Sequence, residues 1–190
     1  MRIPPWNDER APRDPALIEA ILKRRGGALI NLDRALLWSE PLARGWNGFI
    51  GAVRREMSVS ARLREIAICS VAAITGADYE FTHHAPEYVK AGGSEALVQR
   101  LRDPDRAAVD PSFNDDERLA IRYAVAMTRT VTVPQALFDE LRARFSETEI
   151  VELTAAIAAY NMVARILVAL EVPEDSERLA PPASRLPPSP

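Results

Sequence analysis

Apolar residues recur every three or four positions through most of this 190-residue chain, and no stretch alternates apolar and polar residues over the length of a strand. A period of three to four is typical of helices with one buried face, whereas alternation would indicate strands. Cap signals agree with this period: Asn114 and Ser146 each precede a glutamate by three residues, and glycines 26, 76 and 92 follow apolar segments. The sequence therefore predicts an all-α fold.

The chain divides into an extended N-terminal arm (1–14), one helical domain (15–172) and a Pro-rich C-terminal tail (173–190). The tail holds six prolines in eighteen residues, a density that no helix survives, so we expect it to be disordered or to lie across a neighbouring subunit. Within the domain, the pattern predicts helices at about 15–24, 39–51, 60–75, 78–91 and 94–101 and helices beginning near 114, 134 and 146, with a loop at 103–111. Glycines 45, 48 and 51 are expected to loosen the end of the second of these.

The composition is that of an ordinary globular protein, with 47% hydrophobic residues, 27% charged residues and a net charge of −3. This charge gives no reason to expect nucleic acid or an anionic membrane as partner. No 18-residue apolar run is found and Met1–Trp6 is not a signal peptide, so we expect a cytoplasmic protein. Cys69 is the only cysteine, which excludes an intrachain disulfide, a CxxC pair and a thiolate zinc site. Its mid-helix position predicts a buried, inert thiol.

The segment from Arg62 to His84 holds the candidate catalytic residues. Glu80 and His84 are four residues apart and share one helix face, while Glu65 lies on the preceding apolar helix, which must pack against theirs. Two carboxyl groups and an imidazole in apolar surroundings are typical of general acid–base catalysis. We expect a neighbouring carboxylate to raise the pKa of His84, and burial to raise that of Glu65 or Glu80.

Arg62, Tyr79 and Trp46 are candidate substrate-binding residues; Arg62 has the chemistry to hold a substrate carboxylate. For Tyr79 and Trp46 the alternative is packing in the core or at an interface. For the catalytic set the alternatives are an exposed Glu80–His84 pair and a solvent-facing Glu65. No metal site is expected, because adjacent histidines on a helix rarely converge on one ion.

Three segments carry a family resemblance: R-L-R-E-I-A-I from Arg62, T-G-A-D-Y-E-F-T-H-H from Thr75, and the A-A-Y-N-M-V-A-R-I-L-V-A-L helix. They resemble the carboxymuconolactone decarboxylase family, which is AhpD-like, over about residues 35–172. The peroxidase branch resembles Glu-x11-Cys-x2-Cys-x3-His, and here Ala77 and Glu80 stand at the cysteine positions. The decarboxylase branch resembles G-A-D-(Y/F)-E-W-x-x-H, which the chain matches except for Phe81.

The resemblance implies an AhpD-like helical bundle and a cofactor-free lyase similar to 4-carboxymuconolactone decarboxylase. Its substrate would be a small organic acid or lactone from aromatic compound catabolism, decarboxylated or isomerised through an enolate by Glu65, Glu80 and His84. The resemblance also implies a homo-oligomer, either a dimer or a trimer of dimers. Two alternatives stay open: an AhpD-like peroxidase or redox protein, and a non-catalytic oligomeric protein that binds small molecules. Burial of the three residues in a pocket would favour the enzyme, and their exposure the binding protein.

Overall fold

The structure, a computed structural model, describes residues 1–7 and 14–175, and in these residues it contains helices and no strand. The prediction of an all-α fold is thereby confirmed. The chain forms two compact units, one of residues 1–47 with the residues from Leu170 onward, and one of residues 48–169. Almost all of the Pro-rich tail lies outside the described residues, as do residues 8–13 of the predicted arm.

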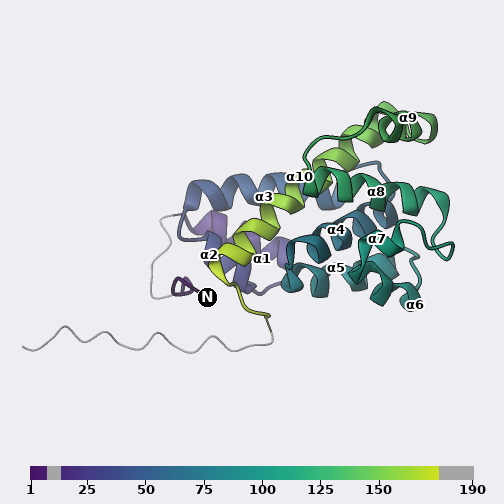
Figure 1. Cartoon of the computed structure of the whole chain (residues 1–190). Helices are drawn as coiled ribbons and strands as arrows, with labels where there is room; N and C mark the ends of the chain where they lie inside the picture. The colour runs from purple at the N-terminus through teal and green to yellow at the C-terminus, as the bar shows by residue number, and fades with distance from the viewer. Residues whose placement is uncertain (8–13, 176–190) are drawn as a thin grey trace, which may run out of the picture. The chain divides into compact units, whose positions relative to one another are not determined.

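The first unit contains three helical segments (Figure 1): α1 (Pro15–Arg25), α2 (Asn31–Leu36) and the beginning of α3 (Glu40–Arg55). Asp33 of α2 is buried and accepts hydrogen bonds from Arg24 and Arg25 of α1, which compensates its charge. Trp6 is also buried, and its backbone N–H donates to the carbonyl of Arg34 at 3.1 Å. This bond fixes the described start of the chain to α2.

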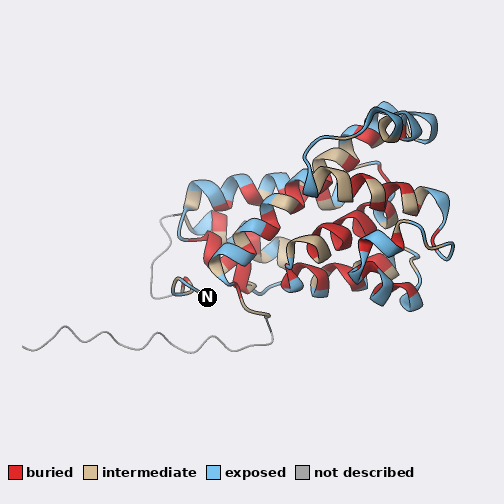
Figure 2. Cartoon of the chain, viewed as in Figure 1, coloured by how far each residue is buried: buried red, intermediate tan, exposed pale blue. Residues whose placement is uncertain are grey.

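The second unit begins with the last turns of α3 and contains the remaining elements, which are α4 (Ala61–Thr75), α5 (Asp78–Lys90), α6 (Glu95–Val98), the 3₁₀ helix η1 (Gln99–Arg102), α7 (Pro104–Ala107), α8 (Asp115–Arg129), α9 (Gln135–Arg144) and α10 (Glu147–Leu170) up to Ala169. α4 packs against both α5 and α8. Its residues from Leu63 to Ala72 are all buried, so α4 is the central helix of the unit (Figure 2). The sequence pattern had predicted that only one face of this helix is buried.

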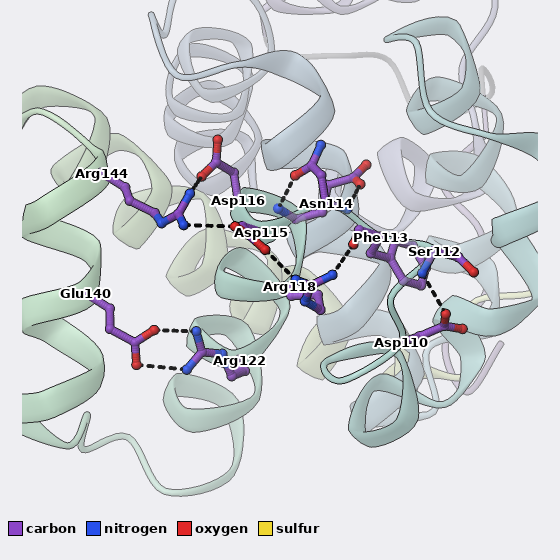
Figure 3. Close-up of polar contacts among 11 residues, drawn as sticks. Asp110, Ser112, Phe113, Asn114, Asp115, Asp116, Arg118, Arg122, Glu140 and Arg144 are labelled. Carbon is purple, nitrogen blue, oxygen red and sulfur yellow. Dashed lines mark hydrogen bonds and ion pairs between the residues drawn. The ribbon is translucent and has the colours of Figure 1, made fainter.

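Polar contacts attach α9 to α8 (Figure 3). Arg122 of α8 forms a bidentate ion pair with Glu140, at 2.9 and 2.6 Å, and Arg144 of α9 reaches Asp115 and Asp116 in the first turn of α8. The capping box predicted at Asn114 is present and begins α8. Because these ion pairs are exposed, they orient α9 more than they stabilise it.

Two local expectations were wrong. α3 continues to Arg55 through its three glycines, because Trp46, Ile50 and Val53 are buried along it and offset the intrinsic cost of glycine in a helix. The predicted loop at 103–111 contains α7, which Asp103 caps by accepting from the N–H of Arg106.

α10 is long and apolar enough to cross a membrane by length and composition alone. Half of its most apolar 18-residue stretch is buried in the fold, as in the core helix of a soluble protein.

Candidate functional site

A tight turn between α4 and α5 positions the candidate residues. Gly76 ends α4 in the left-handed region, at φ +67°, and its N–H donates to the carbonyl of Ala72. Glycine is favoured there because a Cβ atom would be strained. Glu65 lies about 16 Å before this glycine along α4, and His84 about 12 Å after it along α5. Helices that pack back to back across such a turn bring these two side chains close together.

Glu65 and His84 form a buried hydrogen-bonded pair. The distance between Nδ1 of His84 and Oε2 of Glu65 is 2.6 Å, and the two residues are 5% and 4% exposed. The other carboxylate oxygen of Glu65 lies 3.4 Å from Nε of Arg64. Glu65 therefore does not face solvent, and His84 does not belong to an exposed helix pair.

The surroundings determine the proton positions in this pair. Glu65 raises the pKa of His84, as expected of a neighbouring carboxylate, but burial has the larger effect and lowers this pKa below its ordinary 6.5. Burial alone would raise the pKa of Glu65, but the hydrogen bond from His84 and the charges of His84, Arg64 and Arg54 lower it below 4.5. At neutral pH Glu65 is therefore ionised and His84 is neutral, and the carboxylate accepts a hydrogen bond from the Nδ1–H of the imidazole.

The second ring nitrogen of His84 is left available. Within residues 1–7 and 14–175, no group forms a hydrogen bond with Nε2. This atom is also not fully buried. Tyr160 of α10 contacts the imidazole edge to face, with ring centroids 4.7 Å apart and an interplanar angle of 82°. Neutral, held at Nδ1 and unbonded at Nε2, the imidazole is set up as a general base.

Glu80 is the third member of the predicted set. It is 2% exposed, and neither carboxyl oxygen has a hydrogen-bond partner within the described chain. Burial raises the pKa of Glu80 well above 4.5, so the neutral carboxylic acid is favoured. It shares one face of α5 with His84, and its ionised form raises the pKa of Cys69 and of Tyr160, as Glu65 does. The structure thus brings Glu80 to the same interior region but forms no hydrogen bond from it to the pair.

Two of the three predicted substrate-binding residues are already engaged by neighbouring groups. Arg62 donates from Nε to Glu117 of α8 at 2.7 Å and from Nη1 to the carbonyl of Gly92. Tyr79 stacks on His83, with ring centroids 4.3 Å apart. His83 is turned about 100° around α5 from His84. Trp46 belongs to the first compact unit and is buried, and its indole N–H has no partner among the described residues.

Two residues that act on the pair were not among the predicted site residues. Tyr160 lies in a strongly apolar helix and is indistinguishable from a core aromatic in the sequence. Arg54 is one of many arginines and precedes another, Arg55. No sequence signal could have selected either residue, because the ring contact of Tyr160 and the charge of Arg54 reach the pair from helices distant in sequence. No group of three or more possible metal ligands occurs in the part of the chain that the structure describes.

Cys69 lies four residues after Glu65, on the same face of α4. It is completely buried on α4, and burial together with the charges of Glu65 and Glu80 raises the pKa of its thiol far above the neutral range. A thiol held in this form does not attack peroxide.

We expect Cys69→Ala to retain wild-type activity on the protein's substrate and to cost about 1 kcal/mol of stability for the small cavity. Neither the wild type nor the variant should show thiol-dependent turnover of organic hydroperoxides in a coupled peroxidase assay. Peroxide reduction that disappears in the variant would show that the thiol is reactive.

Comparisons with solved structures identify the fold. An AhpD core protein from Ralstonia eutropha, described as an uncharacterized peroxidase-related protein, superimposes with a TM-score of 0.78 at 14% identity, covering 91% of each chain. The debrominase Bmp8, solved as a variant in complex with 2,3,4-tribromopyrrole, superimposes with a TM-score of 0.73 at 19% identity, again over 91% of each chain. The expected AhpD-like fold is thereby confirmed.

The sequence comparison gives the family. The uncharacterized protein YnjA of Escherichia coli is 44% identical over 135 residues, which cover 66% of this chain and 68% of YnjA. No family model matches the chain. The chain therefore belongs to the family of YnjA.

Proposed function

We propose that the protein is a cofactor-free acid–base enzyme that resembles 4-carboxymuconolactone decarboxylase and acts on a small organic acid or lactone. The observation that carries this proposal is the buried Glu65–His84 pair, in which the carboxylate holds Nδ1 and leaves Nε2 unbonded. A carboxylate that orients a histidine in this way also stabilises the imidazolium formed when the ring accepts a proton.

Both reactions of the class can use these groups. In isomerisation, Nε2 of His84 takes a proton from the carbon next to a carbonyl, the electron pair moves to the carbonyl oxygen, and the enolate then regains a proton at another carbon. In decarboxylation, the bond to the carboxylate carbon breaks, carbon dioxide leaves, and its electron pair forms the same enolate. The neutral carboxyl group of Glu80 is the donor that protonates the enolate carbon.

Two observations favour this function over its alternatives. Ala77 and Glu80 occupy the positions at which the peroxidase branch has cysteines, so a redox role has no thiol pair. Glu65, Glu80 and His84 are all buried, a costly arrangement that a binding scaffold without chemistry has no need to keep. The complex of Bmp8 with tribromopyrrole is an example of a small cyclic organic molecule bound by this fold, which fits a lactone-sized substrate.

The proposal is tested with a panel of carboxylated γ-lactones, butenolides and oxo acids in D₂O. Proton NMR follows carbon-bound deuterium incorporation, and a coupled assay follows carbon dioxide release. We expect one subset of the panel to react without added metal, thiol or nucleotide. Turnover only after addition of a thiol reductant and a hydroperoxide would contradict the proposal.

We also propose that the protein is a homo-oligomer, a dimer or a trimer of dimers. α10 exposes Val151, Met162 and Val168, and α3 exposes Phe49, although both helices otherwise contribute to the core. A contact between subunits would remove these apolar side chains from water. Light scattering at micromolar concentration is expected to give a multiple of the 21.0 kDa chain mass; a stable monomer would contradict this proposal.

A further inference from the structure

Tyr160 of α10 differs from Tyr88 and Tyr123, which are equally buried, in the state of its hydroxyl group. The hydroxyl of Tyr88 donates to Glu117 at 3.2 Å, and that of Tyr123 lies 2.7 Å from the hydroxyl of Thr154. Tyr160 is 2% exposed, yet no residue in the described part of the chain forms a hydrogen bond with its hydroxyl. A buried tyrosine hydroxyl usually has a partner, because an unbonded one costs free energy. The hydroxyl of Tyr160 is therefore free to bind a ligand.

This hydroxyl also remains accessible. Among the described residues, the fully buried polar atoms without a partner include both carboxyl oxygens of Glu80 but not the hydroxyl of Tyr160. The hydroxyl thus keeps some accessible surface although its residue is almost enclosed, and the same holds for Nε2 of His84. A small molecule can reach both atoms.

A ring contact brings the two accessible atoms together. The rings of Tyr160 and His84 lie edge to face, with centroids 4.7 Å apart. Nε2 belongs to one of these rings and the hydroxyl is attached directly to the other, so the two rings themselves limit the separation of the two atoms. Glu65 fixes the imidazole at Nδ1, at 2.6 Å. A ligand that contacts Nε2 of His84 is therefore within reach of the Tyr160 hydroxyl.

The proposed reaction needs a hydrogen-bond donor at the carbonyl oxygen of the substrate, where negative charge develops. A fixed donor at such an oxygen contributes about 10²–10³-fold to kcat. Glu65 is ionised and donates no hydrogen bond, and Glu80 has the role of protonating the enolate carbon. Burial raises the pKa of Tyr160 well above its ordinary 10, so its hydroxyl keeps the proton and is a donor at neutral pH.

We propose that the hydroxyl of Tyr160 donates a hydrogen bond to the carbonyl oxygen of the substrate and stabilises the enolate formed at Nε2 of His84. The C–H bond breaks, its electron pair forms a carbon–carbon double bond, and the carbonyl pair moves to the oxygen. The hydroxyl proton stays on Tyr160 throughout. This inference rests on the proposed function and adds a catalytic residue from α10, which selects substrates with a carbonyl group beside the reacting carbon.

Binding of a stable enolate tests the inference. The probe is tetronate, the anion of a β-oxo-γ-lactone, and γ-butyrolactone is its uncharged comparison. The full-length protein, labelled with ¹⁵N-histidine, has only two histidines, and the ring signals of His84 report binding. We expect tetronate to bind saturably and more tightly than the lactone. Tyr160→Phe keeps the ring and removes only the hydroxyl, so it should weaken tetronate binding about tenfold or more and lactone binding less.

Tyr123→Phe is the matched control, because it removes the hydroxyl of another buried tyrosine in the same compact unit. It should bind tetronate like the wild type but unfold at a lower urea concentration, since Thr154 loses its partner. Tyr160→Phe should be at least as stable as the wild type, because no hydrogen bond to a described residue is lost. Equal tetronate affinity in wild type and Tyr160→Phe, or no saturable binding by the wild type, would overturn the inference.

Kinetics separates this inference from the proposed function. On the compound selected by the NMR panel, Tyr160→Phe should lower kcat about 10²-fold with little change in KM. If tetronate binding depends on Tyr160 while turnover survives without His84, the enolate-binding role stands and the acid–base proposal fails. If turnover requires His84 while Tyr160→Phe keeps wild-type kcat and tetronate affinity, the role of Tyr160 alone is wrong.

Discussion

Replacing His84 with alanine is expected to lower kcat by about 10²–10⁴-fold, since the chain would lose the base that Glu65 orients. The pH profile gives a second measurement. Because the neutral imidazole is the active form and burial lowers its pKa, the acid limb of kcat/KM should lie below pH 6.5. Steady-state kinetics across pH on the compound selected by the NMR panel provides both results, with circular dichroism to show that the variant stays folded.

His83→Ala is the matched control for this prediction. His83 is adjacent in sequence but donates from Nδ1 to the carbonyl of Tyr79 and stacks on the Tyr79 ring. We expect it to retain near-wild-type kcat. Glu65→Gln should reduce kcat strongly as well, and the Glu65→Gln/His84→Ala double variant should be little worse than the more damaging single variant, since the residues act as a unit. A damaging His83→Ala with a silent His84→Ala would mean that the wrong histidine has been assigned.

The sequence predicted those parts of the molecule that local patterns determine. The 3.6-residue period and the capping signals gave most helix positions, and Gly76 gave the turn that brings Glu65 and His84 together. Short elements were missed: α2 has only six residues and α7 only four, too few for a period to show. α3 was cut short because glycine propensity was weighted above the burial that tertiary contacts supply.

The candidate site was predictable only as a set of residue types. The spacing of Glu65, Glu80 and His84 along two helices was visible, but their protonation states depend on burial from every side of α4. The predicted role of Arg62 fails to account for Glu117, which lies 55 residues further along the chain and accepts a hydrogen bond from its guanidinium. Such a contact between distant residues is a property of the folded chain and leaves no trace in local sequence.

Replacing Glu80 with methionine is expected to stabilise the protein while damaging its function. The folded carboxyl group keeps its proton above pH 4.5, whereas the unfolded chain releases it near that pH, so the folded state binds more protons in this window. The contribution of Glu80 to stability is therefore full below pH 4.5 and falls as the pH rises through the raised pKa. Methionine fills a similar volume and does not ionise, so the variant avoids this loss of stability at higher pH. It also removes two buried carboxyl oxygens that have no hydrogen-bond partner among the described residues.

Urea unfolding between about pH 5 and pH 8 measures this effect. Glu80→Met should be more stable than the wild type by about 1–3 kcal/mol at the upper end, and the difference should shrink toward pH 4.5. Glu80→Gln is the control, because it removes the ionisation but keeps a buried polar group. Its stability should also lack the pH dependence of the wild type, but its increase in stability over the wild type should be smaller than that of Glu80→Met. Both variants should lower kcat by about 10²-fold. A methionine variant that is less stable than the wild type near pH 8 would show that the Glu80 carboxyl group supports the fold. A gain in stability that costs activity is the behaviour expected of a buried acid kept for chemistry.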